Sequence, residues 1–313
     1  LRYNNKMKKL LKRVFKRIRV DLSLNSEGGW GCFWNYRYGF LKSTVETCGI
    51  NKENYKEFLS DRDYWLKHPI NKAYSSIIDN KLWLPMLLHK YPDLCPKYYF
   101  FKDQYGFLDL YKGCRVSFDV FLENLKKKGK IACKHTHSSL GKGFFILEYR
   151  EGCFFINSEQ KTIDEIKNTF NTLLGYIFTE YVCQHSYAQE VAPESLNTLR
   201  LLTVLDQTSK TFKIVRGFHR FGCNNSIVDN LGQGNGVLCY LDTNTGKLTG
   251  EGVVTLKGEM SVVSDIIHPN SKVSLKDLEL PYYKEISRRI LSIANENSYL
   301  QDNPYDNAIL NAD

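Results

Sequence analysis

Residues 130–148 read KIACKHTHSSLGKGFFILE and combine two short apolar runs with a loop of small and polar residues. The first run, Ile131–Cys133, ends on Lys134, and the second covers Phe144–Leu147. Runs of this length bounded by glycine and serine predict a strand, a loop and a second strand. A lysine that ends the first strand can place its ammonium over an anion held by the loop. The stretch therefore predicts either an anion-binding loop or an ordinary hairpin that contains glycine.

The segment between the two runs, Ser138–Gly143, is called the glycine loop below. Two glycines around a lysine let backbone N–H groups approach an anion closely, and two hydroxyls add further donors. It is not a Walker loop, because GxxxxGK[ST] is absent and an apolar strand, rather than a helix, follows the glycines. The candidate phosphate contacts are Lys134, Ser138, Ser139, Gly141, Lys142 and Gly143.

The composition is that of a globular protein with a core. The 313 residues can form one large or two modest domains, and 42% of them are apolar and 25% charged. No apolar run reaches the roughly 18 residues of a membrane span, and no apolar stretch of a secretory signal follows the basic N-terminus. Nine cysteines without CxxC spacing indicate reduced thiols rather than disulfides or zinc ligands, so we expect a cytoplasmic protein.

Basic residues are concentrated at the N-terminus. Of the 43 lysines and arginines, nine precede the first acidic residue, Asp21, and the remaining 34 balance the 34 acidic residues. A neutral body argues against a broad nucleic-acid-binding face, which needs basic residues across the fold. We therefore expect no nucleic-acid partner.

Residues 1–20 also carry an apolar stripe at helical spacing. Its members are Met7, Leu10, Leu11, Val14, Phe15 and Ile18. One interpretation is a helix that lies on the anionic inner surface of the membrane and makes the protein peripheral. The other is a first helix docked on the core with its charges in solvent. The sequence leaves both interpretations open.

The remaining chain predicts an α+β protein. Residues 21–95 read as mainly helical, and Pro96 marks the predicted start of a first mixed lobe at 96–185. This lobe is followed by a second lobe at 186–300 and by an irregular tail at 301–313. The predicted elements include strands at Tyr98–Phe101, Cys153–Asn157 and Tyr176–Val182, helices at Phe118–Lys128 and about 162–174, hairpins around Thr208–Lys210 and Thr243–Gly246, and a closing helix at Tyr282–Asn297. Because hairpins pair antiparallel strands, we expect α+β rather than a parallel doubly wound sheet.

Two polar features in this pattern have more than one interpretation. Glu180 is the one acid in the apolar strand Tyr176–Val182, and a lone carboxylate is costly to bury without a partner. It therefore either forms a structural ion pair or contacts a ligand. His135 and His137 stand two residues apart but lack a third ligand, so metal ligands remain unknown.

The order of the pieces is more informative than any one of them. A strand that ends in a lysine, the glycine loop and a strand that ends in an acid are followed by four short motifs. The motifs are Ser195–Arg200 (SLNTLR), Ile227–Asn230 (IVDN), Asp242–Gly246 (DTNTG) and Ile267–Pro269 (IHP). From about Leu84 to Leu300, the chain resembles the ATP-grasp superfamily, and most closely its branch associated with polysaccharide and sugar-transfer gene clusters.

The resemblance implies an ATP-grasp fold in which two α+β lobes clasp ATP, preceded by the helical N-terminal region. Lys134 would contact the phosphates, and the glycine loop would fold over them. Glu180 would face the adenine amino group, while the backbone of Tyr181 and Val182 would pair with the edge of the ring. The expected cofactors are ATP and Mg²⁺.

The resemblance also implies roles for polar residues of the second lobe. Arg200 would neutralise charge on the phosphates or on an acyl phosphate, and Arg220 is a second candidate catalytic cation. A guanidinium suits either role because its planar donor fork matches phosphate and carboxylate oxygens. Both arginines could instead pair with buried acids. The candidate substrate contacts are Asn197, Asp229 and Asn230, and the last two could also help a metal or form a structural turn.

Proteins that share this resemblance usually perform ligation, in which ATP phosphorylates a carboxylate and an amine attacks the acyl phosphate while metal ions bridge the phosphate oxygens. The family normally continues after the closing helix with one strand that bears an aspartate and another that bears Glu-x-Asn, which hold the metal. No Glu-x-Asn follows Leu300 here, so we expect either a chain that is incomplete at its end or an altered metal site.

Three functional hypotheses follow. The leading one is an ATP-dependent carboxylate–amine ligase that modifies a cell-surface polysaccharide such as a capsule, or its precursor, with a saccharide or amino-acid-like acceptor. The second is another phosphoryl or glycosyl transfer on the same scaffold, because a fold does not fix a reaction. The third is a non-catalytic nucleotide-binding subunit of a polysaccharide assembly complex at the membrane.

Overall fold

The computed structural model describes residues 21, 34–67, 74–139, 141–206, 208–231, 235–298 and 308–312, with backbone alone at 47 and 308–312. The predicted N-terminal helix at 1–20 lies outside the described residues, as do Leu140, Gly232, Gly234 and most of the predicted tail. The chain divides into two compact units, Leu1–Ser75 and Ser76–Asp313. The lobe boundaries expected from the sequence remain predictions.

The described part of the first unit consists of short helices. They are α2 (Trp34–Arg37), α3 (Lys42–Cys48), η1 (Tyr55–Glu57) and α4 (Asp61–Lys67). The buried Asp21 carboxylate accepts hydrogen bonds from the Tyr36 hydroxyl at 2.8 Å and from the backbone N–H groups of Lys42 and Ser43 at 2.7 and 3.1 Å. Burial raises the pKa of this carboxyl, but its hydrogen bonds outweigh burial and hold the pKa below the ordinary value. Asp21 thus satisfies donors that the start of α3 would otherwise leave unpaired.

Short helices also lead into the second unit. They are α5 (Ser75–Asp79), η3 (Lys81–Trp83), α6 (Leu84–Leu87) and η4 (Pro92–Leu94). The Asn80 side chain accepts a hydrogen bond from the N–H of Leu82, and this cap starts η3. Such short helices gain little stability from their own hydrogen bonds, so they depend on tertiary contacts.

The first sheet of the second unit contains, among the described residues, eight strands in the order β3-β2-β1-β8-β4-β5-β6-β7. Every neighbouring pair is antiparallel. The strands are β1 (Tyr98–Asp103), β2 (Gly106–Asp109), β3 (Cys114–Val116), β4 (Lys130–His135), β5 (Phe145–Arg150), β6 (Cys153–Ile156), β7 (Glu159–Lys161) and β8 (Tyr176–Glu180).

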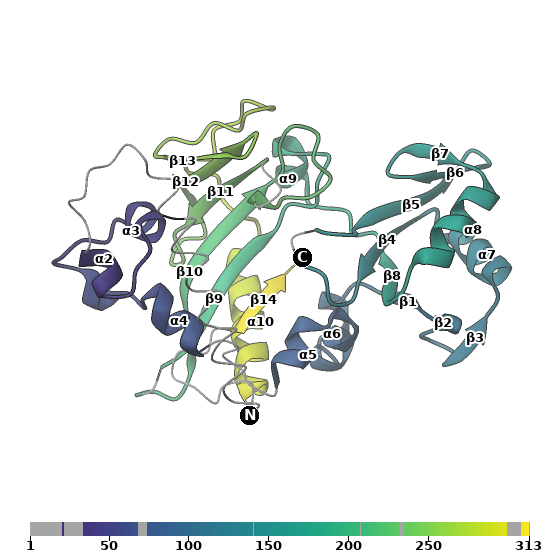
Figure 1. Cartoon of the computed structure of the whole chain (residues 1–313), viewed down its shortest axis with the longest axis horizontal. Helices are drawn as coiled ribbons and strands as arrows, with labels where there is room; N and C mark the ends of the chain where they lie inside the picture. Colours follow the sequence, from purple (N-terminus) through teal and green to yellow (C-terminus); the bar gives the residue numbers. More distant parts are fainter. Residues whose placement is uncertain are drawn as a thin grey trace. The chain divides into compact units, whose positions relative to one another are not determined.

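Helices α7 (Phe118–Lys128) and α8 (Ile163–Thr172) pack on this sheet and bury an aromatic core (Figure 1). The centroid of the Phe121 ring lies 4.5 Å from that of Phe107 and 4.9 Å from that of Phe178. Ser117 caps α7 by accepting a hydrogen bond from Val120 N, and α7 has the predicted bounds. A reciprocal pair of bonds between Thr162 and Glu165 opens α8.

The second sheet has, in the described part of the chain, six antiparallel strands in the order β13-β12-β11-β10-β9-β14. They are β9 (Leu199–Leu205), β10 (Phe212–Phe221), β11 (Gly236–Leu241), β12 (Leu248–Leu256), β13 (Glu259–Val263) and β14 (Ala308–Ala312). Helix α10 (Tyr283–Glu296) buries Ile290 and Tyr283 against Leu199, Leu201 and Leu248 of this sheet (Figure 1). A shorter helix, α9 (Ser186–Val191), connects the two lobes in sequence.

Helices together with two antiparallel sheets confirm the predicted α+β class. Two strands are shorter than predicted: β6 ends at Ile156 rather than Asn157, and β8 ends at Glu180 rather than Val182. The N–H of Glu180 bonds to the carbonyl of Lys97, the residue before β1 begins, at 2.8 Å. Beyond this point β1 offers no further partner, so the chain leaves the sheet as an irregular segment at 181–185, called the hinge below.

Candidate functional site

The glycine loop leaves β4 at His135 and returns to the sheet at β5. Gly141 and Gly143 have φ values of 69° and 72°, a region that residues with side chains disfavour. Space is also short, because a Cβ on Gly143 would lie 2.6 Å from Oη of Tyr176, and one on Gly141 would lie 3.0 Å from Val228. The loop therefore requires glycine at both positions. The other candidate contacts, Ser138, Ser139 and Lys142, lie in the same loop.

The structure adds Lys81, which the sequence reasoning missed, to this loop. Its Nζ donates hydrogen bonds to the carbonyl of His135 at 3.3 Å and to that of Ser138, and its N–H donates to the carbonyl of Thr136 at 3.0 Å. Its own carbonyl accepts a hydrogen bond from the Tyr98 hydroxyl at 2.9 Å. Fifty-seven positions separate Lys81 from Ser138, so spacing along the chain gives no signal for this contact.

Lys134 lies on β4 opposite Ile177 of β8 and is half-buried. Burial raises the pKa of the Cys95 thiol, and the positive charge of Lys134 opposes that rise. The ammonium group of Lys134 therefore lies near Cys95, where the chain enters β1. Lys142 is exposed in the glycine loop. Together with Lys81, these lysines bring three ammonium groups to the loop and the strand that precedes it.

Glu180, at the end of β8, has a structural partner. Its carboxylate lies 3.8 Å from the Lys97 ammonium and accepts a hydrogen bond from the Lys97 N–H at 3.2 Å. The carboxylate side chain is nevertheless 39% exposed, so it remains accessible to a ligand. Tyr181 and Val182 follow as the first residues of the hinge, and the Lys130 ammonium lies 4.2 Å from the centroid of the Tyr181 ring.

Arg200 and Arg220 share one face of the second sheet. Arg200 on β9 is directly opposite Phe218 on β10, and Arg220 follows Phe218 by two positions. Directly opposed residues share a face, as do residues two apart in one strand. Leu199, which precedes Arg200, and Phe221, which follows Arg220, are buried in the core on the other face. The register therefore brings two guanidinium-bearing positions to the face away from the core, which the sequence alone could not show.

Arg220 belongs to a buried polar network. One of its terminal nitrogens lies 3.1 Å from Oδ1 of Asp229, and the two side chains are only 11% and 8% exposed. Oδ2 of Asp229 accepts hydrogen bonds from the N–H and the hydroxyl of Thr198, and that hydroxyl accepts one from Nε of Arg220 at 3.0 Å. Asp229 is thus a buried acidic partner of Arg220, which was one of the two roles that the sequence left open for this arginine. The network fixes the orientation of its guanidinium.

Asn197 is buried and its amide is used within the protein. Nδ2 donates to Oε1 of Gln184 at 2.8 Å and to the carbonyls of Ala188 and Ala192, while Oδ1 accepts from Ser195 and from the N–H of Gly222. These bonds tie the end of the hinge and α9 to the start of β9. A substrate contact of Asn197 remains a prediction, and the same holds for Asn230, the residue after Asp229.

A comparison with protein families finds one family whose model matches the chain. The profile described as sugar-transfer associated ATP-grasp matches residues 62–306. The chain belongs to the sugar-transfer associated ATP-grasp family. The suspected family is therefore confirmed, and proteins with the ATP-grasp fold generally bind ATP with Mg²⁺. No curated protein and no solved structure matches the chain.

Two of the motifs that carried the resemblance stabilise the ATP-grasp second lobe. His268 of the IHP motif donates from Nε2 to the carbonyl of Gly222 at 2.8 Å, so its Nδ1 accepts from Ser271. Desolvation lowers the pKa of this imidazole, which favours the neutral form that this arrangement needs. In the DTNTG turn, Gly246 has a φ of 80°, and a Cβ there would lie 2.5 Å from the Tyr283 ring. These residues hold loops to the sheet.

The described residues contain no clustered set of metal-ligating side chains. Among them, no group of three or more His, Cys, Asp or Glu side chains could hold a metal ion. Asp229, one of the predicted substrate contacts and a candidate to help a metal, is bonded to Arg220 and Thr198. We therefore assign no metal ligands in this ATP-grasp protein. A search of the described helices also found none long and apolar enough to cross a membrane.

Proposed function

We propose that this ATP-grasp protein is an ATP-dependent ligase that joins a carboxylate to an amine on a cell-surface polysaccharide or its precursor. The observation that supports this most strongly is the set of cations. Lys81 and Lys142 accompany the glycine loop, Lys134 ends the preceding strand, and Arg200 and Arg220 share one face of the second sheet. Such a set suits a substrate that carries several phosphate oxygens.

The nucleotide-binding part of the proposal follows from the first lobe. Positive φ values at Gly141 and Gly143 let the loop turn tightly, so that backbone N–H groups can approach an anion, and Lys134 adds a charge. Lys81 holds the loop through the carbonyls of His135 and Ser138. Glu180 is the acceptor for the adenine amino group, and the irregular backbone after it is available to pair with the ring edge.

The chemical part follows from the second lobe. In the proposed first step a substrate carboxylate oxygen bonds to the γ-phosphorus, and the bond from that phosphorus to ADP breaks. In the second step an amine bonds to the acyl carbon, the bond to phosphate breaks, and the amine proton is released. In both steps negative charge develops on oxygens in the transition state. Fixed hydrogen-bond donors stabilise the transition state more than they stabilise the ground state, and this lowers the barrier. Arg200 would supply this stabilisation, and the oriented Arg220 would bind the carboxylate.

An ADP-release assay with a panel of amino acids, amino sugars and uronic acids tests the reaction. We expect ADP to appear with at least one carboxylate and amine pair. Replacing Arg200 by lysine keeps the charge but removes the planar fork, and turnover should fall by about 10²-fold or more. Arg216→Lys, on an exposed position of β10, is the matched control and should keep full turnover. Binding of ATP without ADP release from any pair would contradict the ligase proposal.

A further inference from the structure

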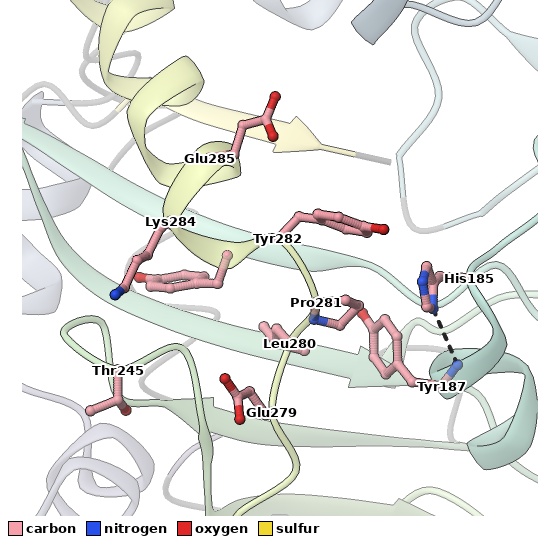
Figure 2. A pocket seen from close by; sticks show the side chains of 10 residues that line it. His185, Tyr187, Thr245, Glu279, Leu280, Pro281, Tyr282, Lys284 and Glu285 are labelled. Carbon is pink, nitrogen blue, oxygen red and sulfur yellow. Dashed lines mark hydrogen bonds between the residues drawn. The ribbon is translucent and has the colours of Figure 1, made fainter.

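A pocket of about 600 Å³ lies on the second lobe (Figure 2). It is formed by the start of α9, the turn between β11 and β12 and the segment that leads into α10. Of the segments considered above for ATP, phosphate or substrate contacts, the hinge alone reaches it, through its last residue His185. Its size is within the range of pockets that bind small molecules. The pocket therefore has the size of a small-molecule site, and none of the roles given above is assigned to it.

Aromatic rings form one side of the pocket. Figure 2 shows the Tyr282 and Tyr187 rings on the same side as His185. The centroid of the His185 ring lies 5.5 Å from that of Tyr187 and 6.2 Å from that of Tyr282. Tyr282 is 72% exposed and has a φ of 60°, a conformation that bulky side chains disfavour. An exposed phenol ring held in this conformation offers an uncovered face to a ligand.

The Tyr187 wall is fixed from behind. Nδ1 of His219 lies 3.1 Å from the carbonyl of Arg220, which can only accept, so Nδ1 carries the proton. Nε2 of His219 then accepts a hydrogen bond from the Tyr187 hydroxyl at 2.7 Å. His219 is fully buried, so this bond anchors the phenol in the core. Binding at a wall that is already ordered loses little side-chain entropy.

The remaining lining is polar. Glu279 and Glu285 contribute carboxylates, Lys284 an ammonium group and Thr245 a hydroxyl, and all four residues are exposed. Carboxylate oxygens accept hydrogen bonds from hydroxyl groups, while aromatic faces cover carbon-bound hydrogens. Two carboxylates against one ammonium disfavour an anionic ligand. The lining therefore suits a compact ligand that has hydroxyl groups on its edge, an apolar ring face and no negative charge.

We infer that this pocket binds a saccharide unit, either neutral or amine-bearing. A pyranose ring combines a face of carbon-bound hydrogens with an edge of hydroxyl groups, which matches the rings of Tyr282 and Tyr187 and the carboxylate of Glu279. Binding of the saccharide does not depend on the proposed function. The saccharide would thus occupy a pocket separate from the arginine face.

Saturation-transfer NMR on the full chain tests the inference. The probes are methyl β-glucoside, methyl β-glucosaminide and methyl β-glucuronide. We expect transfer to the ring hydrogens of the first two, and at least about tenfold weaker binding of the glucuronide, because two carboxylates repel it. Absence of transfer to all three sugars, or equal binding of the glucuronide, would overturn the inference.

Variants locate the binding. Tyr282→Ala removes the exposed ring, and Glu279→Gln removes one carboxylate. Each variant should bind the glucoside about tenfold more weakly, which corresponds to about 1.4 kcal/mol of binding free energy. Tyr111→Ala is the matched control, because Tyr111 is similarly exposed, at 68%, but lies in the first lobe. Both tyrosines are exposed, so circular dichroism should show folded protein in each case. Unchanged binding in both Tyr282→Ala and Glu279→Gln would overturn the location.

A parallel titration of the unmodified chain with ATP separates this inference from the proposed function. Sugar binding without ATP binding would leave the pocket intact and remove the ligase proposal. ATP binding without sugar binding would do the reverse. Binding of both, with the variant pattern given above, supports the pocket and leaves the ligase proposal in place.

Discussion

At the scale of single residues, the candidate nucleotide site depends on lysines from separate segments. Lys134 comes from β4, and Lys81 comes from η3 and reaches the glycine loop through the carbonyl of Ser138. The two lysines differ in what they contact. Lys81 is bonded within the protein, whereas the charge of Lys134 acts on the nearby Cys95. We expect loss of Lys81 to affect the loop itself and loss of Lys134 to affect the ligand.

Lys134→Ala should weaken ATP binding by about 1.5–3 kcal/mol, the range for a charged hydrogen bond lost from a site. The melting temperature should change little, because the side chain is half-buried rather than enclosed. Titration calorimetry and a thermal melt measure the two effects. Lys167→Ala, on an exposed position of α8, is the control for loss of one positive charge. A large fall in melting temperature with unchanged ATP affinity would show that Lys134 is structural.

Arg220→Ala should destabilise the protein by about 3–5 kcal/mol, because it leaves the Asp229 carboxylate buried without its partner charge. Urea unfolding measures the change. Arg216→Ala, on the exposed part of the same strand, should change stability by less than about 0.5 kcal/mol. Equal stabilities of the two variants would mean that the pair with Asp229 contributes nothing, and the geometric account of Arg220 would be wrong.

His219 should make stability depend on pH. Burial lowers its pKa from the ordinary value of 6.5 to about 4. Between these values the unfolded chain binds a proton that the folded protein does not, so stability is full above pH 6.5 and falls as the pH drops toward 4. One pKa unit corresponds to about 1.4 kcal/mol. Between pH 6 and 5 the free energy of unfolding of His219→Gln should therefore fall by about 1.4 kcal/mol less per pH unit than that of the wild type.

Urea unfolding at several pH values measures this slope. His185→Gln, which removes an exposed imidazole, is the control. The comparison uses slopes rather than absolute stabilities, so any loss of packing in His219→Gln does not enter. Identical slopes in the wild type and His219→Gln would contradict a buried neutral imidazole.

At the scale of elements, the sequence predicted those whose signals are local. Helix α7 was predicted with its observed bounds because Ser117 and Gly129 mark its two ends. The three-residue strand β3 and the largely exposed edge strand β13 carry no alternation that marks them, and only their partners make them strands. Strand β8 was predicted two residues too long, because its end depends on where its neighbour β1 begins.

The candidate site divides in the same way. The glycine loop and Lys134 form one continuous stretch, so their proximity follows from the sequence. The contact of Lys81 with the loop depends on the tertiary fold, and the common face of Arg200 and Arg220 depends on the register of β9 and β10. The same holds for Asn197, whose polar type suggested a substrate contact although its amide bonds to α9 and the hinge.

Gly143→Ala should destabilise the glycine loop and weaken ATP binding. The new Cβ would lie 2.6 Å from Oη of Tyr176 in a backbone conformation with a φ of 72°. Gly152→Ala is the matched control, because Gly152 has a φ of 78° but nothing within 4 Å of the added Cβ. Both should lose about 1–2 kcal/mol from the left-handed backbone, and only Gly143→Ala should lose ATP affinity. Calorimetry and urea unfolding measure both, and equal ATP affinities would contradict the assigned role of the loop.

Residues 1–20 carry the predicted membrane contact. Their nine positive charges and apolar stripe predict that deleting them abolishes binding to anionic liposomes. Each cation near an anionic surface contributes about 1 kcal/mol, so salt should release the intact protein. Liposome sedimentation measures binding, and calorimetry should show that ATP still binds. A deletion variant that no longer folds would show instead that this segment belongs to the core.

At the scale of the whole molecule, the account joins three pieces of chemistry on an ATP-grasp scaffold. In the proposed function, lysines and backbone N–H groups of the first lobe bind the phosphates, and the second sheet presents two arginines on one face. A separate pocket beside α10 has the lining of a saccharide site. The family match, at residues 62–306, covers all three pieces, and its description associates such chains with sugar transfer. Nucleotide binding is the claim on which the proposed reaction depends.

Titration calorimetry of the unmodified protein with Mg-ATP and Mg-GTP tests that claim most directly. The Glu180 carboxylate can accept a hydrogen bond from the amino group of adenine, and the hinge backbone can pair with the adjacent edge of the ring. In guanine a carbonyl oxygen would face the same carboxylate, and two acceptors cannot form a hydrogen bond. The account predicts a single ATP site and clearly weaker binding of GTP. Equal affinity for the two nucleotides would contradict the adenine assignment, and no heat from either would contradict the nucleotide site.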